Sequence, residues 1–315
     1  MKIAVLDDYQ NVARDMADWS GLEAAHDITF FNDIYEGLEG FARRLAPFDI
    51  VCIMRERSPF KRDLIERLPN LKLVVTAGMR NAALDLDACK DHGVPVLGTG
   101  GSAQATPELA WGMMLSLARN IHIENARMRE GSWITTLGVD MQGKTLGVLG
   151  LGRLGTKMSQ IARAFDMKVI AWSQNLTDAK AAEAGVTRVG KEDLFRQADF
   201  LTIHYKLGER SRGLVGAAEL ALMKPTAYLV NTSRGPVVDT DALIAALTEG
   251  RIAGAGVDVY DSEPLPADHP IRNCPRTILT PHLGYVTDGT YSAFYGEIVE
   301  SIESWLAGNP IRVLA

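Results

Sequence analysis

Short apolar runs rich in β-branched residues recur along the chain, and each is followed by a stretch with helical periodicity. Continuous apolar runs of this kind are typical of strands buried on both faces of a parallel sheet. Five expected strands precede residue 100: Ile3–Leu6, Ile28–Phe31, Ile50–Met54, Leu73–Thr76 and Val94–Leu97. Six follow it: Thr145–Leu149, Lys168–Trp172, Phe200–His204, Ala227–Asn231, Ala255–Asp258 and Thr277–Thr280. The alternation predicts an α/β fold with two doubly wound parallel sheets.

A change in composition near residue 100 separates the two series. Residues 98–102 read Gly-Thr-Gly-Gly-Ser, a small and flexible stretch. A long helix is expected after it, with Thr106 as N-cap, Pro107 at the first helical position and an end near Arg129. This helix carries an apolar stripe typical of packing in a core or between domains: Leu109, Met113, Leu117 and Ile121.

Composition and charge narrow the classes of protein that fit. The 315 residues suggest two domains, and 33 Lys and Arg against 39 Asp and Glu give a net charge of −6. That balance argues against nucleic acid or an anionic membrane as the main partner. The three cysteines are far apart, so neither a disulfide framework nor a metal cluster is expected. No apolar stretch reaches the about 20 residues that span a bilayer, and the first residues do not resemble a secretory signal. We expect a reduced, cytoplasmic protein.

A glycine-rich motif follows the expected strand Thr145–Leu149 and opens a helical pattern. It reads Gly150-Leu-Gly152-Arg153-Leu154-Gly155. Gly150 permits a tight turn, Gly152 lets a pyrophosphate approach the backbone, and Gly155 lets helix and strand pack closely. The helix N-terminus offers its unpaired N–H groups to the phosphates. The same spacing occurs by chance in tight turns, but strand, spacing and helix together predict a dinucleotide site.

The residue that would hold the ribose of the dinucleotide departs from the usual pattern. An acid is expected at the end of the next strand, and Ser173 stands there, followed by Gln174 and Asn175. A 2′-phosphate would therefore meet no fixed negative charge, yet no Arg is present to attract it. The sequence permits either NADP or NAD.

Polar residues follow the later strands, at the sheet edge where ligands bind in doubly wound folds. They are His204, Thr232, Ser233, Arg234, Asp258, Glu263 and His282. Arg234 could bind a carboxylate through its planar fork, and His282 could protonate a carbonyl oxygen as hydride arrives. Glu263 could orient the imidazole and favour its charged form. Each residue alone would be assigned to surface charge or structure. Their coincidence downstream of a nucleotide loop predicts reduction of a 2-keto acid.

The chain resembles the D-isomer-specific 2-hydroxyacid dehydrogenase family in four motifs, at residues 150–155, 231–239, 258–264 and 280–284. The resemblance covers essentially the whole chain. It implies that Arg234 binds and orients the substrate, Glu263 pairs with the imidazole, and His282 is the acid/base. It implies that Asp258 contacts the nicotinamide amide. The residues implied to contact the cofactor are Thr106, Gly150, Gly152, Arg153, Leu154, Gly155, Ser173, His204, Thr232, Ser233, Asp258 and Gly284. Those implied to contact the substrate are Arg55, Ala77, Gly78, Arg234 and His282, with Gly78 offering its N–H to the carboxylate.

The resemblance also implies a domain plan and an assembly. A Rossmann nucleotide-binding domain over residues 100–286 would be inserted in a flavodoxin-like substrate domain, formed by residues 1–99 and 287–315. The helix Tyr291–Leu306 would return to that first domain, and the cleft would hold the substrate. The protein would be a homodimer, with the helix from Thr106 and the segment around Trp133 in its interface.

Several features leave the substrate open. Lys206 and Arg80 depart from the residues usual in the family, and Tyr285 could form a wall of the pocket. Arg55 and Arg57 end an expected strand. They are either solvated surface charges or, for Arg55, a contact to a second anionic group. The leading hypothesis is an NAD(P)-dependent reductase of glyoxylate, hydroxypyruvate or a longer analogue. Alternatives are a 3-phosphoglycerate dehydrogenase and a nucleotide-sensing corepressor on the same fold.

Overall fold

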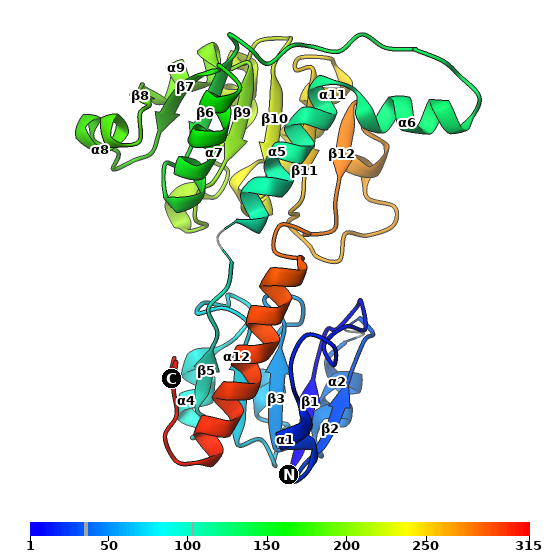
Figure 1. The fold of residues 1–315 in the computed structure, drawn as a ribbon, viewed down its shortest axis with the longest axis vertical. Coiled ribbons are helices and arrows are strands. Elements are labelled where there is room, and N and C mark those ends of the chain that lie inside the picture. Colours follow the sequence, from blue (N-terminus) through cyan, green and yellow to red (C-terminus); the bar gives the residue numbers. More distant parts are fainter. Residues whose placement is uncertain (35–36, 103) are drawn as a thin grey trace. The chain divides into compact units, whose positions relative to one another are not determined.

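The computed structural model describes residues 1–34, 37–102 and 104–315, which fall into two compact units. The first unit consists of Met1–Ser102 and Val286–Ala315, and the second of Ala103–Tyr285. Each unit has a parallel sheet of its own with helices on its faces (Figure 1). The predicted fold class, two doubly wound parallel sheets, is confirmed.

The sheet of the first unit has the strand order β2-β1-β3-β4-β5. Its strands are β1 (Lys2–Val5), β2 (Asp27–Phe30), β3 (Ile50–Ile53), β4 (Leu73–Thr76) and β5 (Val96–Gly98). Its helices are α1 (Ser20–Glu23), α2 (Leu38–Leu45), α3 (Arg62–Ile65), α4 (Leu86–Asp91) and α12 (Asp288–Leu306). The order reverses between β1 and β3, and ligands bind at the carboxyl ends of strands on either side of such a reversal.

Residues from the end of the sequence complete this first unit. Helix α12 packs on β4 and β5, and it begins at Asp288, one turn before the expected start at Tyr291. Thr287 caps it by accepting a hydrogen bond from the N–H of Thr290. Beyond the helix, the N–H of Val96 donates to the carbonyl oxygen of Ala315 at 2.9 Å, so the last residues pair with β5.

The sheet of the second unit has the strand order β12-β11-β10-β9-β6-β7-β8. Its strands are β6 (Thr145–Leu149), β7 (Lys168–Trp172), β8 (Thr187–Arg188), β9 (Phe200–Ile203), β10 (Tyr228–Asn231), β11 (Gly254–Val257) and β12 (Thr277–Leu279). Its helices are α5 (Ala105–Ala118), α6 (Ile121–Arg129), α7 (Arg153–Ala164), α8 (Asp178–Glu183), α9 (Lys191–Gln197), α10 (Ala217–Leu222) and α11 (Thr240–Thr248). Helices α5 and α7 cover one face, and α9 to α11 pack in the core of the other (Figure 1). The order reverses between β6 and β9.

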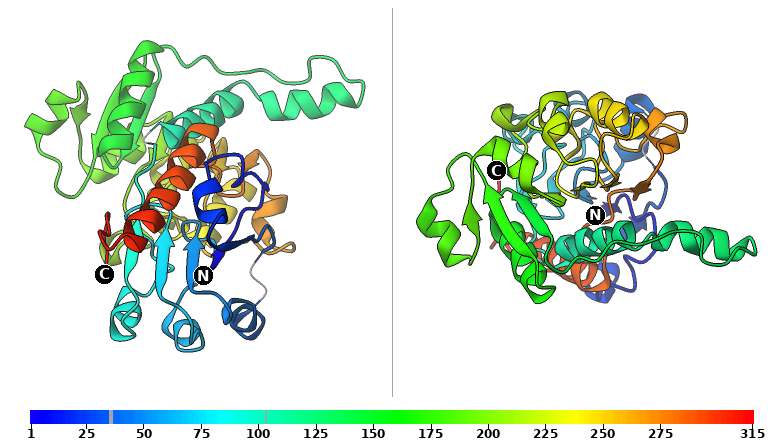
Figure 2. Two further views of the ribbon diagram at one scale, coloured as in Figure 1. Left: turned by 60° about the horizontal axis from the view of Figure 1, so that its bottom comes forward. Right: turned by 90° about the horizontal axis from the view of Figure 1, so that it is seen from above.

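The prediction of a single helix from Thr106 to Arg129 is wrong, because the helix is interrupted between α5 and α6. Asn120 adopts a left-handed backbone at φ 52°, which asparagine tolerates better than most residues. The expected N-cap is also wrong. Gln104 occupies the N-cap position of α5 without a capping hydrogen bond from its side chain, and the Thr106 hydroxyl donates to the Gly284 carbonyl oxygen at 2.7 Å. Ile121 is 53% exposed rather than packed. Helix α6 extends away from the sheet of its own unit (Figures 1 and 2).

No helix in the described part of the chain is both long and apolar enough to span a bilayer.

A buried carboxyl group lies at the carboxyl end of β1, beside the reversal in the first sheet. Asp7 is 2% exposed and accepts a hydrogen bond from the Ser58 hydroxyl at 2.7 Å. The Arg57 guanidinium contacts the Asp7 carbonyl oxygen and donates to the Tyr291 hydroxyl at 2.7 Å. Burial outweighs these contacts and raises the pKa of Asp7 to about 6. Arg57 is therefore half-buried and hydrogen-bonded within this unit, and it is not a solvated surface charge.

We expect Asp7→Asn to raise the free energy of unfolding at pH 8, by up to about 3 kcal/mol. The native pKa of Asp7 lies above its ordinary value of 3.8, so native stability falls as pH rises through about 6. Asparagine removes that loss and tolerates the left-handed backbone at φ 64°. Urea unfolding at pH 5 and pH 8 measures the difference. Asp49→Asn is the control of opposite sign, because a hydrogen bond from Lys72 lowers the pKa of Asp49. An Asp7 variant no more stable at pH 8 than the wild type would contradict the expectation.

Candidate active site

The glycine loop joins β6 to α7 at the reversal of the second sheet. Gly150 has φ 101°, and a Cβ there would lie 2.5 Å from the His204 carbonyl oxygen. A Cβ on Gly155 would lie 2.2 Å from the Gly150 carbonyl oxygen. Gly152 caps α7, and a Cβ there would meet no atom within 4 Å. The first and third glycines are thus needed for packing of the chain itself, whereas the second leaves the backbone accessible to a ligand.

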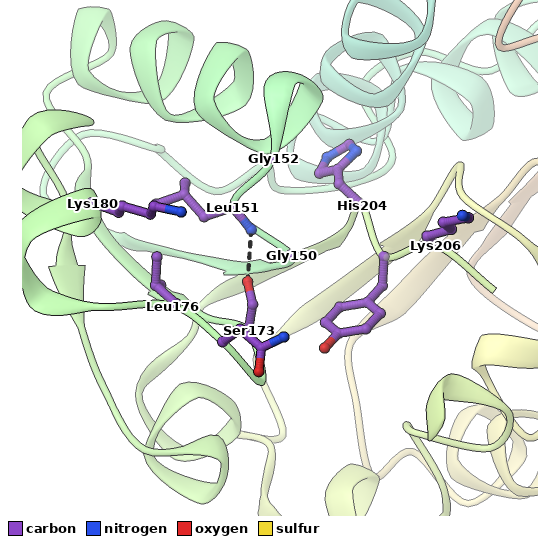
Figure 3. A pocket seen from close by; sticks show the side chains of 10 residues that line it. Gly150, Leu151, Gly152, Ser173, Leu176, Lys180, His204 and Lys206 are labelled. Carbon is purple, nitrogen blue, oxygen red and sulfur yellow. Dashed lines mark hydrogen bonds between the residues drawn. The ribbon is translucent and has the colours of Figure 1, made fainter. Parts of the chain in front are cut away.

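A pocket of about 280 Å³ opens beside this loop (Figure 3). Its lining residues are Gly150, Leu151, Gly152, Ser173, Asn175, Leu176, Lys180, His204, Tyr205 and Lys206. The Leu151 N–H donates to Ser173 Oγ at 3.0 Å, which joins the glycine loop to the end of β7. Among these lining residues, all of them described, none is Asp or Glu. Sequence reasoning overlooked Lys180, although a cation shortly after the ribose-binding position could have been noted.

His204 follows β9 and lines the same pocket. Its Nε2 lies 2.8 Å from Thr202 Oγ1, and burial lowers the pKa of the imidazole to about 4. The ring is therefore neutral at physiological pH. Thr232, at the end of the neighbouring strand β10, has a buried hydroxyl oxygen with no hydrogen-bond partner among the described residues. The open Gly152, the lining cations and this hydroxyl fit a polar, anionic dinucleotide.

An imidazole–carboxylate pair lies at the carboxyl ends of β11 and β12, which are adjacent and parallel. His282 Nδ1 is 2.6 Å from Glu263 Oε2, and the other carboxylate oxygen accepts the Tyr260 N–H at 2.9 Å. The His282 N–H donates to the Asp258 carbonyl oxygen at 2.9 Å, which fixes the backbone below the ring. Because Nδ1 is held, Nε2 is the atom suited to proton transfer. The Tyr285 ring packs edge-on against this imidazole, with 5.3 Å between centroids.

Asp258 organises the turn that presents His282. Its side chain is fully buried and accepts hydrogen bonds from the Thr280 hydroxyl at 2.5 Å, the Leu283 N–H at 2.7 Å and the Gly284 N–H at 2.9 Å. Burial raises the pKa of this carboxyl group, and the three donors oppose that effect. With the Thr106 hydroxyl bound to the Gly284 carbonyl oxygen, the structure brings Thr106, Asp258 and Gly284 together.

Arg234 follows β10, the next strand of the same edge. Its Nη1 donates to the Ser233 carbonyl oxygen at 2.8 Å, and the Asn231 amide donates to the Arg234 carbonyl oxygen at 3.1 Å. A Cβ on Gly235 would lie 2.1 Å from the Tyr260 carbonyl carbon, so glycine is needed where this turn meets the loop after β11. Arg234, Glu263 and His282 are thus carried by three neighbouring strands of one sheet.

The expected substrate contacts in the first unit lie at the ends of β3 and β4. Arg55 packs on Gly78, where a Cβ would lie 2.1 Å from Arg55 Nη1 and φ is 88°. The Gly78 N–H, expected to bind substrate, donates to Thr99 Oγ1 at 2.7 Å in this structure. Ala77 is buried beside it, and Arg80 is exposed. The structure therefore joins Arg55, Ala77 and Gly78 in one cluster and leaves Arg80 outside it.

Comparison with known proteins adds to this geometry. The family model described as the D-isomer specific 2-hydroxyacid dehydrogenase, NAD binding domain, matches residues 111–284. A glyoxylate reductase of Aeropyrum pernix is 38% identical over 72% of this chain and 71% of its own. A hydroxypyruvate reductase of Blautia hydrogenotrophica is 29% identical over 100% of this chain and 99% of its own. The crystal structure of a phosphoglycerate oxidoreductase from Vibrio cholerae is similar with a TM-score of 0.93, at 35% identity over 98% of this chain and 99% of that one.

Proposed function

Since the chain belongs to the D-isomer specific 2-hydroxyacid dehydrogenase family, we propose that it reduces a small 2-keto acid to the D-2-hydroxy acid with NAD(P)H as hydride donor. The observation that carries the proposal is the 2.6 Å pair between His282 Nδ1 and Glu263 Oε2, on the sheet edge that also carries Arg234. Proteins similar to this chain are named for glyoxylate, hydroxypyruvate and phosphoglycerate chemistry, which supports a 2-keto acid as substrate.

The chain's own residues would act as follows. With its pyrophosphate held at the glycine loop, a bound dinucleotide would supply, from its reduced nicotinamide, the hydride that the keto carbon accepts. Arg234 binds the substrate carboxylate through two parallel N–H groups and so fixes the orientation of the carbonyl. Protonated His282 gives its Nε2 proton to the carbonyl oxygen, which becomes the hydroxyl group. Glu263 holds Nδ1 and stabilises the charge of the imidazolium before the transfer.

Cofactor contacts are proposed for the residues gathered around the glycine loop and the neighbouring strand ends. They are Thr106, Gly150, Gly152, Arg153, Leu154, Gly155, Ser173, His204, Thr232, Ser233, Asp258 and Gly284. Ser173 stands where a carboxylate would repel a 2′-phosphate, and we propose that the enzyme accepts NADPH as well as NADH. Ala77 and Gly78 are proposed to contact the substrate.

A 3-phosphoglycerate dehydrogenase activity is the second candidate. The Arg55 guanidinium packs on Gly78 and would supply a cation for a second anionic group on the substrate. The similar phosphoglycerate oxidoreductase from Vibrio cholerae supports the same interpretation.

The test is oxidation of NADH and NADPH by the purified protein with a panel of keto acids. Glyoxylate, hydroxypyruvate and 3-phosphohydroxypyruvate separate the two candidates, because only the last carries a second anion. We expect turnover with at least one unphosphorylated acid. Turnover of the phosphorylated acid alone would establish the second candidate. Nucleotide binding without any turnover would favour a nucleotide-sensing corepressor instead.

We propose a homodimer that acts in the cytoplasm. The segment after α6 presents Trp133, Ile134 and Leu137, which are 73%, 77% and 93% exposed. Large apolar side chains that are exposed so close together in the sequence fit a surface that another protein covers, and a second copy of the chain is the proposed partner. The three cysteines are free, and Cys52 and Cys89 are buried, which fits a reducing compartment.

We expect Glu263→Gln to lower kcat by about 10–100-fold with little change in cofactor affinity. Glutamine keeps the size of the side chain but removes the charge that stabilises the imidazolium. Steady-state kinetics and cofactor titrations on both proteins measure the two effects. Glu249→Gln is the matched control, because Glu249 lies on the surface in an ion pair with Arg251. An unchanged kcat would show that the Glu263 charge does not serve the reaction.

A further inference from the structure

The pocket beside the glycine loop contains a lysine that the proposed chemistry does not use. We propose that Lys180 is a specificity-determining residue that binds the 2′-phosphate of NADP(H). This inference rests on the proposed function, because it requires a dinucleotide at the glycine loop. It goes beyond the sequence analysis, which noted that no Arg follows Ser173, did not consider Lys180 and left the choice of cofactor open.

The position of the ribose in this pocket follows from the end of β7. Ser173 stands where doubly wound dinucleotide sites place the group that contacts the ribose hydroxyls. Its Oγ accepts the Leu151 N–H at 3.0 Å, so the hydroxyl hydrogen is left to donate to a ligand. The Gln174 N–H donates to the Tyr205 hydroxyl at 3.2 Å and fixes the next residue of the turn. These two internal hydrogen bonds therefore fix the turn at the expected ribose site.

Lys180 reaches this site from the first turn of α8. Thr177 caps the helix by accepting the Lys180 N–H at 3.3 Å, and Leu176 is buried and anchors the preceding turn. The Lys180 side chain extends toward Leu151, whose N–H is bound to Ser173, and all three residues line the pocket (Figure 3). Asp178, the acid at the start of the helix, is paired with Arg188 at 3.3 Å.

The charge of the pocket favours a phosphate group at this place. A phosphate monoester carries about −1.5 to −2 charges near pH 7 and accepts strong hydrogen bonds. Lysine binds phosphate as a point charge, in a charge-assisted hydrogen bond. The described lining of the pocket contains two lysines and no carboxylate to oppose them. The Lys206 side chain points away from Ser173 (Figure 3), which singles out Lys180 as the lysine on the ribose side.

Binding of nucleotide fragments tests the assignment without any need for catalysis. Isothermal titration calorimetry gives Kd for 2′,5′-ADP and for 5′-AMP, which differ only in the 2′-phosphate. We expect Lys180→Met to raise Kd for 2′,5′-ADP by about tenfold, equal to about 1.4 kcal/mol of binding free energy. Kd for 5′-AMP stays within about twofold, and Lys180→Arg keeps most of the affinity for 2′,5′-ADP. The wild-type preference for 2′,5′-ADP falls with added salt, because the side chain is exposed and the attraction is screened.

Lys206→Met is the matched control from the same pocket, and we expect it to leave the ratio of the two Kd values within about twofold. Equal weakening of both fragments by Lys180→Met would overturn the inference, since the lysine would then act on the nucleotide in general. An unchanged ratio in Lys180→Met would overturn it as well. If the protein binds no nucleotide, both this inference and the proposed function fail. If the fragments behave as expected but no keto acid is reduced, only the proposed function fails.

Discussion

His282→Ala lowers kcat for keto-acid reduction by about 10²–10⁴-fold, the range that a positioned general acid contributes. The imidazole is held through Nδ1 by Glu263 at 2.6 Å, and its backbone is fixed by Asp258. Alanine removes the proton donor while leaving these supports in place. Hydride transfer to the carbonyl carbon then produces an alkoxide that only water can protonate.

Two measurements separate this loss from a structural one. The dissociation constant of the reduced cofactor stays within about twofold, because the glycine loop and its pocket lie at other strands of the sheet. His269→Ala is the control, since His269 caps the short turn at residues 270–273. A kcat of His282→Ala that remains within a few-fold of the wild type would assign the proton to another donor.

Arg234→Lys raises KM for keto acids by about 10²-fold, which corresponds to about 2.7 kcal/mol. Lysine keeps the positive charge but cannot donate two parallel hydrogen bonds to a carboxylate. Arg234 is half-buried in a turn held by Asn231 and Ser233, so the replacement does not settle into the same geometry. The kcat also falls, because the carbonyl is no longer held for hydride transfer.

Cofactor binding is the readout that decides what Arg234 does. We expect the dissociation constant of NADH or NADPH to stay nearly constant while KM for the keto acid rises. Arg251→Lys, at an exposed ion pair with Glu249, should change neither quantity. Equal weakening of cofactor and keto acid would identify Arg234 as a structural or cofactor residue.

Apolar runs and strand ends made most of this architecture predictable. A strand buried on both faces needs a continuous apolar run, and the residue after it must lie at the ligand-binding edge. Arg234, Glu263 and His282 could therefore be selected from the sequence. The interruption between α5 and α6 could not be predicted, because the helical periodicity continues across Asn120 and one left-handed residue does not change that pattern. The two-residue strand β8 was not predicted either, because Thr187 and Arg188 form no apolar run.

Contacts of side chains with residues distant in the sequence could not be predicted either. Lys180 belongs to a separate short helix, and its place in the pocket depends on the turn that Thr177 and Leu176 set. The hydrogen bond from the Gly78 N–H to Thr99 links the residues that follow β4 and β5, so no local sequence pattern predicts it. Contacts of this kind follow from the packed structure rather than from spacing along the chain.

Because the first unit is divided between two stretches of sequence, its residues leave the ribosome at two separate times. Residues 103–285 are contiguous, so the second unit has all its strands once they have emerged. The first unit has its five strands early, but it lacks α12, which packs on β4 and β5, and the pairing of Ala315 with β5 until the last residues emerge. The side of β4 and β5 on which α12 packs is thus uncovered through most of synthesis, and domains generally fold as units once their residues are available. We expect nascent chains halted before residue 286 to engage chaperones through their N-terminal hundred residues.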